Sequence, residues 1–385
     1  MRSVMGAATL KVVLCCMFPI SLPADTLPCG ANWESGEEVS DIPRTFRWGV
    51  QRPNLLRYNR VEGFSIGVRA QFRPQSALGP ISVTSTARLG LADLKPILRL
   101  DFTRETIQER ITFSGFHELT AIDERAGHFN LGNSISALVA GRDDGDYYRR
   151  SGASLEWVHP TMEQSSLRIR AFGEYHRPAT IETDFSIWGL IKDNLEWRPN
   201  IGADEGWFLG GSLEISSKWG TDPLFPRGGL LVSVEGAAGT AEYARADLLG
   251  SLDIPIFADT RISLEAGIGT SLGALPRQRL WYLGGPSTLR GVTPRALGGN
   301  KFFRVRGEVA RSFSFGDVSL FSDGGWAPYS GTLGWDTDGP LFSIGSGLAV
   351  LDRLIHLDAS WNLGDPGVFT GGRFRFHTYL DTVPF

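Results

Sequence analysis

Apolar and polar residues alternate along most of this chain. In the segment 261–269 the even-numbered residues are apolar, whereas the odd-numbered residues are Arg, Ser, Glu or Gly. In the segment 303–309 the odd-numbered residues are Phe, Val or Gly, and the even-numbered residues are Arg or Glu. Successive side chains of a β-strand point to opposite faces of the sheet, so each segment predicts a strand with one apolar and one polar face.

Segments of this kind recur from Tyr58 almost to the end of the chain. We count about 16 candidate strands, about eleven between Tyr58 and Thr270 and about five between Lys301 and Leu380, an even number typical of bacterial outer-membrane barrels. In such a barrel the apolar face meets lipid and the charged face meets a watery lumen. The fold class predicted is therefore all-β, a transmembrane antiparallel β-barrel. A soluble β-sandwich or propeller, with the apolar faces against a core, is the alternative.

The N-terminus has the pattern of an export signal. Arg2 supplies a positive charge, Val4 to Phe18 is mostly apolar, and Ser21 to Ala24 offers a cleavage site. This predicts a signal peptide over 1–24, a polar periplasmic lead-in over 25–57 and the barrel over 58–385. An uncleaved membrane anchor is the alternative, although the apolar span is shorter than the ~20 residues that a crossing helix needs. The expected location is the bacterial outer membrane.

Composition narrows the protein class further. Of the three cysteines, only Cys29 remains after cleavage, so no internal disulfide is expected. No later segment approaches the ~18 consecutive apolar residues of a transmembrane helix. A net charge of -4 and a pI of about 5.9 provide no basic surface for nucleic acid. The 47 glycines, 23 Phe and 11 Trp suit a turn-rich β protein with aromatic girdles.

The lengths of the connections indicate an orientation. If both termini are periplasmic, connections after odd-numbered strands face outward. Two long connections, His176–Gly206 and Ser271–Asn300, then lie outside, whereas short turns such as Asp352-Arg353 stay inside. The second long connection is the sixth outer loop and carries the most distinctive sequence of the chain, the glycine-framed arginine of Leu283 to Val292.

This loop and the strands after it resemble the BamA/TamA family of outer-membrane assembly proteins, also called bacterial surface antigens. The matching residues are the loop glycines and Leu-Arg-Gly, an acidic residue on the next strand, and a Phe-x-Asp-x-Gly motif on the strand after that. In this chain they are Gly284, Gly285, Leu289, Arg290, Gly291, Glu308, Phe321, Asp323 and Gly325. The resemblance is strong over roughly Thr240 to Leu363 and weaker before it.

The resemblance implies that the sixth loop folds back into the lumen, where Arg290 meets Glu308 and Asp323. Glu308 shares the parity of Arg304 and Arg306 and is expected to face the lumen for that reason alone. Charge-assisted and bidentate bonds would hold the loop. Because lumenal water would screen these charges, we expect ~1–3 kcal/mol of loop anchoring. The alternative is that Arg290 is a solvated loop residue.

In this family the seam between the first and last strands opens, and a client pairs with the exposed edge. Here we expect the seam to join Phe64, Ile66 and Val68 to Phe374 and Phe376. The pair Gly371-Gly372 could kink the last strand and weaken the seam, or be an ordinary turn.

The function implied is promotion of insertion or translocation of polypeptide, or lipid, at the outer membrane; the alternative is a passive pore or structural barrel. The expected partners are outer-membrane lipid and lipopolysaccharide and client polypeptides, with no nucleic acid. Because the chain has no segment for the POTRA domains of the family, a periplasmic POTRA-like or chaperone partner is also expected.

Enzyme activity is not expected, nor is a metal or other cofactor. No two of the six histidines have metal-ligand spacing such as i, i+4, and nothing in the sequence singles out a nucleophile. His356 and His377 have lumenal parity and are interpreted as polar lumen residues. The acidic segment Gly141–Asp146 lacks the ligand spacing of a calcium loop and is interpreted as a solvated tight turn.

Overall fold

The computed structural model describes residues 45–48, 55–74, 79–162, 164–191, 196–329, 339–351, 353–363 and 373–380. The expected signal peptide and the pair Gly371-Gly372 lie outside the described residues, as does most of the expected lead-in. Within the described ranges, no helix is both long enough and apolar enough to span a membrane.

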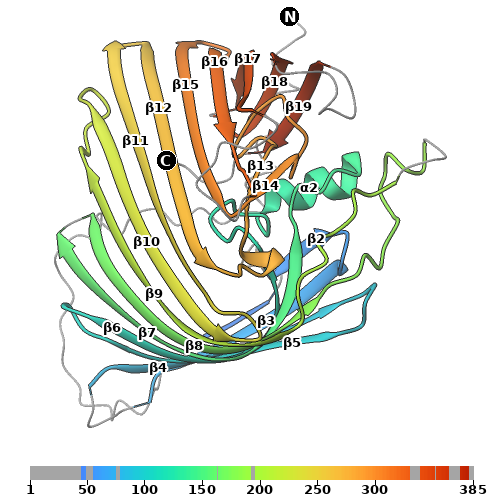
Figure 1. Ribbon diagram of the computed structural model, residues 1–385, viewed down its shortest axis with the longest axis vertical. Helices are drawn as coiled ribbons and strands as arrows, with labels where there is room; N and C mark the ends of the chain where they lie inside the picture. The colour runs from blue at the N-terminus through green and yellow to red at the C-terminus, as the bar shows by residue number, and fades with distance from the viewer. Residues whose placement is uncertain are drawn as a thin grey trace, which may run out of the picture.

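The architecture is a single large antiparallel sheet that curls into a barrel (Figure 1). Its first strands are β1 (Thr45–Trp48), β2 (Leu56–Asn59), β3 (Gly63–Phe72), β4 (Ile81–Gly90), β5 (Pro96–Glu105), β6 (Arg110–Ala121), β7 (Tyr147–Met162), β8 (Ser165–Pro178) and β9 (Gly206–Trp219). The rest are β10 (Arg227–Gly239), β11 (Tyr243–Phe257), β12 (Thr260–Gly273), β15 (Lys301–Phe313), β16 (Gly316–Trp326), β17 (Leu341–Val350), β18 (Ile355–Asn362) and β19 (Phe374–Leu380). The short pair β13 (Trp281–Leu283) and β14 (Leu297–Gly299) forms a separate two-stranded sheet.

Each long strand pairs with its neighbour in sequence, from β3 through β12 and then from β15 through β19. Both β1 and β2 pair with the remaining edge of β3, β2 at Gly63–Ile66 and β1 at Val68–Gln71, so together they occupy one strand position. The result is a 16-strand antiparallel sheet, which confirms the predicted fold class and strand number. The first strand position begins before Tyr58, because β1 and the first two residues of β2 lie within the segment that the sequence assigned to the lead-in.

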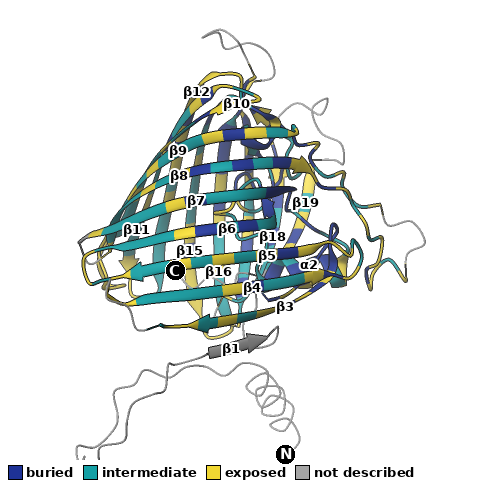
Figure 2. Cartoon of the chain, turned by 90° about the horizontal axis from the view of Figure 1, so that it is seen from below, coloured by how far each residue is buried: buried dark blue, intermediate teal, exposed yellow. Residues whose placement is uncertain are grey.

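Exposure alternates along the strands as the sequence pattern predicts (Figure 2). On β3, Phe64, Ile66 and Val68 are exposed whereas Ser65 is buried, and on β19 Phe374 and Phe376 are exposed whereas His377 is buried. The apolar side chains therefore point outward. This is the reverse of a soluble sandwich, in which those residues would form the core.

The connections separate into two rims of different character. Connections that follow odd-numbered strand positions share one rim, called here the loop rim, which carries the long segments 122–146, 179–205 and 274–300. The opposite rim, called the turn rim, carries short connections such as 106–109, 258–259 and 314–315. The lengths agree with the asymmetry expected of outer-membrane barrels.

Among the described residues, the α-helix α2 (Leu131–Ala140) interrupts the β structure, in the connection between β6 and β7. Asn130 caps its N-terminus by accepting a hydrogen bond from the backbone N–H of Asn133, and Gly141 ends it in the left-handed conformation at φ 65°. A 3-10 helix, η2 (Arg277–Arg279), lies in the segment 274–300. In Figure 1, α2 lies beside β13 and β14, in the gap between β19 and β2.

Candidate functional site

The sixth outer loop, residues 274–300, packs its tip against the inner wall of the barrel. Leu283, Leu289 and Val292 are at most 2% exposed and form an apolar cluster with Phe302 and Leu341 from the strands. A Cβ built on Gly325 of β16 would lie 3.1 Å from the side chains of both Leu283 and Leu289. Glycine at 325 therefore lets the loop tip approach the strand backbone closely.

Arg290 lies between the two carboxylates that the sequence singled out. Its Nε and Nη2 donate to the two oxygens of Asp323 at 2.9 and 2.8 Å, a bidentate arrangement. Its Nη1 donates to Oε2 of Glu308 at 2.6 Å. The guanidinium also stacks over Phe321, with its carbon 3.7 Å from the ring centroid. Four of the motif residues thus meet at one point on the wall formed by β15 and β16.

The loop backbone is held at the same point. The N–H of Arg290 donates to Oδ2 of Asp323 at 2.9 Å, and the Oγ of Ser343 donates to the carbonyl of Arg290. Gly291 follows with φ at +86°, and a Cβ there would lie 3.1 Å from the Cβ atoms of Ser343 and Ser360. Both the conformation and the space require glycine at position 291.

Two further glycines shape the turn that presents the arginine. The N–H of Gly284 donates to Oγ1 of Thr288 at 2.7 Å, and the N–H of Gly285 donates to the carbonyl of Val292 at 2.9 Å. The loop is therefore a closed turn with internal hydrogen bonds rather than an extended strand.

The ion pair between Arg290 and Asp323 is more deeply buried than the sequence suggested. The side chain of Arg290 is 5% exposed and that of Asp323 is 0% exposed, so lumenal water does not screen the pair as expected. Burial by itself would lower the pKa of Arg290, but the hydrogen bonds and charge of Asp323 outweigh it and raise the pKa above its ordinary value. Removal of one partner of a buried pair costs ~3–5 kcal/mol, more than the ~1–3 kcal/mol expected for a solvated one.

The position of the lateral seam differs by one strand from the position that the sequence predicts. Because β1 and β2 cover the edge of β3, Phe64, Ile66 and Val68 lie on the second strand position rather than at the seam. The seam is therefore the gap between β2, with β1, on one side and β19 on the other. Among the described residues, β19 pairs with β18 alone. Phe374 and Phe376 do lie on the last strand, as expected.

Helix α2 occupies this gap and contacts both β2 and β19 (Figure 1). Arg142, directly after the helix, is hydrogen-bonded to Nδ1 of His377 on β19. On the other side, Arg57 of β2 stacks on Phe129, the residue before the helix cap, with its guanidinium carbon 3.7 Å from the ring centroid. The helix thus bridges two strands that are not paired with each other in the described part of the chain.

The helix follows the same inside–outside rule as the strands. Gly132, Asn133 and Ser136 line a cavity inside the barrel, whereas Ile135 and Val139, one turn apart, are exposed. The N–H groups of Ile187 and Trp188 donate to the carbonyls of Leu138 and Val139 at 2.8 and 2.9 Å. The fourth outer loop, residues 179–205, therefore satisfies the carbonyls that the helix C-terminus leaves free.

The segment after α2 is not the solvated turn that the sequence suggested. Asp143 and Asp146 are each 4% exposed. Arg60, in the turn between β2 and β3, pairs with both of them, at 3.4 and 3.2 Å. Asp146 also pairs with Arg198 of the fourth loop at 2.8 Å and with Arg295 of the sixth loop at 2.9 Å. These acidic residues join four segments of the loop rim.

Sequence reasoning missed α2 and this ion-pair cluster. A helix signal was present, because Asn130 and Gly141 frame the helix as an N-cap and a left-handed C-cap residue. No sequence pattern indicated the ion-pair partners of Asp143 and Asp146, since Arg60, Arg198 and Arg295 are far away in sequence.

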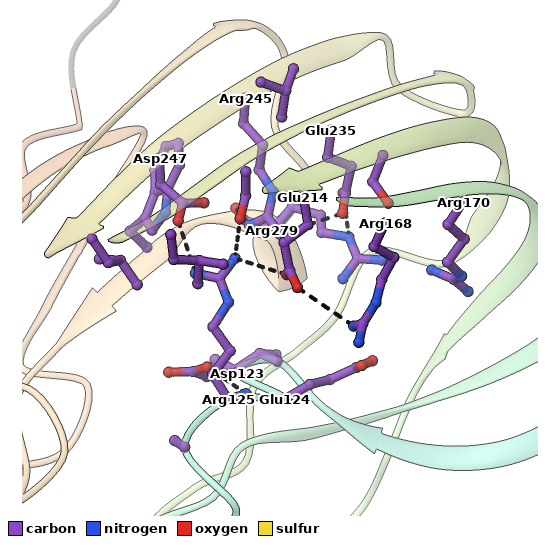
Figure 3. Close-up of a pocket in the computed structure, with 18 of the residues that line it drawn as sticks. Asp123, Glu124, Arg125, Arg168, Arg170, Glu214, Glu235, Arg245, Asp247 and Arg279 are labelled. Atoms are coloured by element: carbon purple, nitrogen blue, oxygen red, sulfur yellow. Dashed lines mark hydrogen bonds and ion pairs between the residues drawn. The ribbon is translucent and has the colours of Figure 1, made fainter. Parts of the chain in front are cut away.

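Inside the barrel, a cavity of about 910 Å³ is lined by arginines and carboxylates from both the wall and the loops (Figure 3). Arg125, from the segment before α2, reaches across to Asp247 of β11 at 2.8 Å and to Ser233 of β10 at 2.6 Å. Arg279 of η2 pairs with Glu235 of β10 at 3.1 Å. Two connections of the loop rim therefore enter the lumen, and ion pairs attach each of them to the wall.

The fold has counterparts among solved structures. BamA from Haemophilus ducreyi lacking POTRA domains 1–3 matches with a TM-score of 0.57 at 13% sequence identity, over 87% of this chain and 70% of that chain. CdiB from Escherichia coli matches with a TM-score of 0.50 at 14% identity, over 84% of this chain and 60% of that chain. No protein-family model matches, and no curated protein matches by sequence. The barrel is therefore BamA-like in fold.

Proposed function

We propose that this protein is an outer-membrane barrel that promotes insertion or translocation of polypeptide at its lateral seam. The observation that carries the proposal is the seam itself. Within the described residues, β19 and β2 share no strand pairing and α2 lies between them, so the strand edges beside the helix retain backbone groups that an incoming strand could use.

The apolar outer surface supports a location in a membrane. Side chains such as Ile268, Leu320 and Phe376 are between 58% and 67% exposed and face outward around the barrel. A surface this apolar is unfavourable in water but suits lipid hydrocarbon. The BamA-like fold supports the outer membrane in particular.

The buried Arg290 pair supports a role of the sixth loop in holding the strands beside the seam. It fixes the loop to β15 and β16, and Arg375 of β19 donates to Oγ1 of Thr293 in the same loop at 2.9 Å. The last strand is therefore attached to the loop as well as to β18. We propose that an incoming strand pairs with β19 while the sixth loop holds β19 in place and α2 moves aside.

A passive pore is the second candidate, and the lumenal cavity favours it. A polar space of about 910 Å³ remains between the inserted loops and the wall, and its lining carries charges of both signs. A channel of this kind would conduct ions without requiring any movement of the seam.

The two candidates separate in one reconstituted system. Purified protein in phosphatidylcholine vesicles is supplied with an unfolded outer-membrane barrel, and folding of the client is followed by its heat-modifiable migration. The proposal expects faster folding than in vesicles without the protein. Equal rates of client folding with and without the protein would rule out insertase activity. Ion conductance across the same vesicles would then support the pore.

A further inference from the structure

A short apolar stretch of the fourth outer loop, called here the apolar loop segment, lies beside the seam. It runs from Phe185 to Ile191 and has no ionisable side chain, whereas Asp184 precedes it and Lys192 follows it in the sequence. Its five large apolar side chains are all exposed, and Leu190 and Ile191 are the most exposed, at 70% and 72%. Neither the Arg290 site nor the proposed strand pairing uses these side chains.

The path of the fourth loop places this segment on the outer face of the wall. Tyr58 of β2 is directly opposite Phe64 of β3, and their ring centroids are 4.9 Å apart, so Tyr58 points outward as Phe64 does. Phe64 is exposed, whereas Tyr58 is only 3% exposed, and its hydroxyl donates to the carbonyl of Phe185. The fourth loop therefore covers the outward side of β2 instead of folding into the lumen. In Figure 1 this loop extends past α2, away from the barrel.

The backbone of the apolar loop segment is hydrogen-bonded within the protein. The N–H groups of Ile187 and Trp188 donate to carbonyls of α2, as described above, and the N–H of Gly189 donates to Oγ of Ser186 at 2.9 Å. The N–H groups that have such acceptors are those of Phe185, Ile187, Trp188, Gly189, Leu190 and Ile191. Hydrocarbon offers no acceptors, so a segment that enters it must satisfy its N–H groups internally. The segment meets this requirement.

The segment also belongs to a continuous apolar surface across the seam. Phe64 of β3 and Phe374 of β19 are exposed at the loop-rim ends of their strands, one on each side of the seam. Between these strands α2 presents Ile135 and Val139, which are exposed as well. The apolar loop segment is bonded to the last turn of this helix. The outer surface that we assign to lipid therefore continues over the seam and onto the segment.

We infer that the apolar loop segment inserts into the outer leaflet of the membrane, with Leu190 and Ile191 among the acyl chains and Trp188 near the headgroups. The inference rests on the proposed membrane location and goes beyond it, because it assigns lipid as the partner of this loop. Since the backbone of Ile187 and Trp188 is bonded to α2, a segment held by lipid also holds the helix in the seam. The membrane thereby stabilises the closed seam.

The depth of the segment can be measured with a nitroxide label, without any client. Leu190→Cys and Ile191→Cys are labelled singly in the mature chain carrying Cys29→Ser, in phosphatidylcholine vesicles. Electron paramagnetic resonance then compares collisions of the label with oxygen and with a water-soluble nickel chelate. We expect the oxygen-to-nickel ratio to match that of Leu320→Cys, which is exposed on the outer face of β16. It should be at least tenfold higher than that of Glu242→Cys, in the exposed turn between β10 and β11.

A second measurement tests whether the segment holds α2. The double variant Leu190→Glu/Ile191→Glu, whose charges oppose insertion, is compared with the parent by amide hydrogen exchange in lipid nanodiscs. We expect the amides of α2 to exchange at least tenfold faster in the variant. The matched control is Leu224→Glu/Phe225→Glu, which alters an exposed apolar pair at the turn rim and should leave exchange in α2 unchanged. Equal exchange in α2 of the parent and the Leu190→Glu/Ile191→Glu variant would show that lipid does not hold the helix.

Three results of the labelling experiment would overturn the inference. A ratio at residues 190 and 191 as low as that of Glu242→Cys would place the segment in water. If Leu320→Cys still reports lipid in that case, the membrane location stands and the insertion alone is wrong. Spin–spin broadening that disappears on dilution with unlabelled protein would show that a second copy of this chain covers the segment. Few collisions with either reagent, without such broadening, would show that the segment is buried within its own chain.

Discussion

Asp146 and Arg295 form an ion pair of 2.9 Å that joins the connection after α2 to the sixth outer loop. The same carboxylate also accepts from Arg60 and Arg198, so one buried side chain links four segments of the loop rim. This arrangement makes the loops a connected cap over the seam instead of independent surface loops.

Replacement of Asp146 should loosen the cap. Asp146→Asn leaves three guanidinium groups around a neutral amide, and loss of one charge from a buried ion-pair cluster costs ~3–5 kcal/mol. We expect faster amide hydrogen exchange in residues 179–191 and 274–300. The control is Asp259→Asn, which alters an exposed pair with Arg311 at the turn rim. Unchanged exchange in both loops would show that the cluster does not hold them.

Charge reversal at Arg290 should release the sixth loop. Arg290→Glu places three carboxylates together, whereas Arg290→Ala removes the pair and should cost ~3–5 kcal/mol of stability. Limited trypsin digestion is expected to cut the Arg290→Glu variant within the loop, at Arg279 or Arg295, while the parent stays intact. Arg290→Lys retains the charge without the bidentate geometry and should be intermediate. If the sixth loop of Arg290→Glu resists trypsin as well as the loop of the parent does, Arg290 does not anchor the loop in the lumen.

The turn between β2 and β3 should lose stability in acid. Burial would raise the pKa of Glu62, but the charge of Arg57 and its hydrogen bonds at 2.8 and 3.0 Å outweigh this and lower the pKa below its usual 4.5. The stabilisation is therefore fully present above pH 4.5 and is lost as the pH falls through the lowered, folded-state value. Urea unfolding should separate parent from Glu62→Gln at pH 7, and the difference should shrink as the pH falls below 4. A difference that is independent of pH would exclude an ionised Glu62 as the cause.

A tether between α2 and β19 should slow client insertion. Arg142 and His377 are in contact across the seam, so Arg142→Cys and His377→Cys, with Cys29→Ser, can be joined by a cleavable bismaleimide. We expect the tethered protein to insert client no faster than empty vesicles do, with recovery after cleavage. The control tether joins Glu105→Cys to Arg110→Cys, a pair within one hairpin at the turn rim. Full activity of the protein tethered across the seam would mean that clients do not enter there.

The sequence by itself determined the long strands, their inside and outside faces and the residues that meet at Arg290. Alternation is a local property, because each strand residue points to the face opposite its neighbours, so parity alone placed Glu308 inside and Phe376 outside. The sixth-loop residues were recognisable because their spacing resembles that of a known family. The order of the strands followed in turn, since each long strand pairs with its sequence neighbour.

Only the tertiary structure decided where the seam lies and what fills it. The seam moved by one strand because β1 and β2, two short segments with little alternation, pair along the edge of β3. Helix α2 lies in the gap because of contacts with residues far from it in sequence, such as Arg57 and His377. The same is true of burial: Asp143 and Asp146 look like turn residues, and only the convergence of arginines from other loops makes it favourable to bury them. Such long-range contacts leave no periodic trace in the chain, and the sequence could not show them.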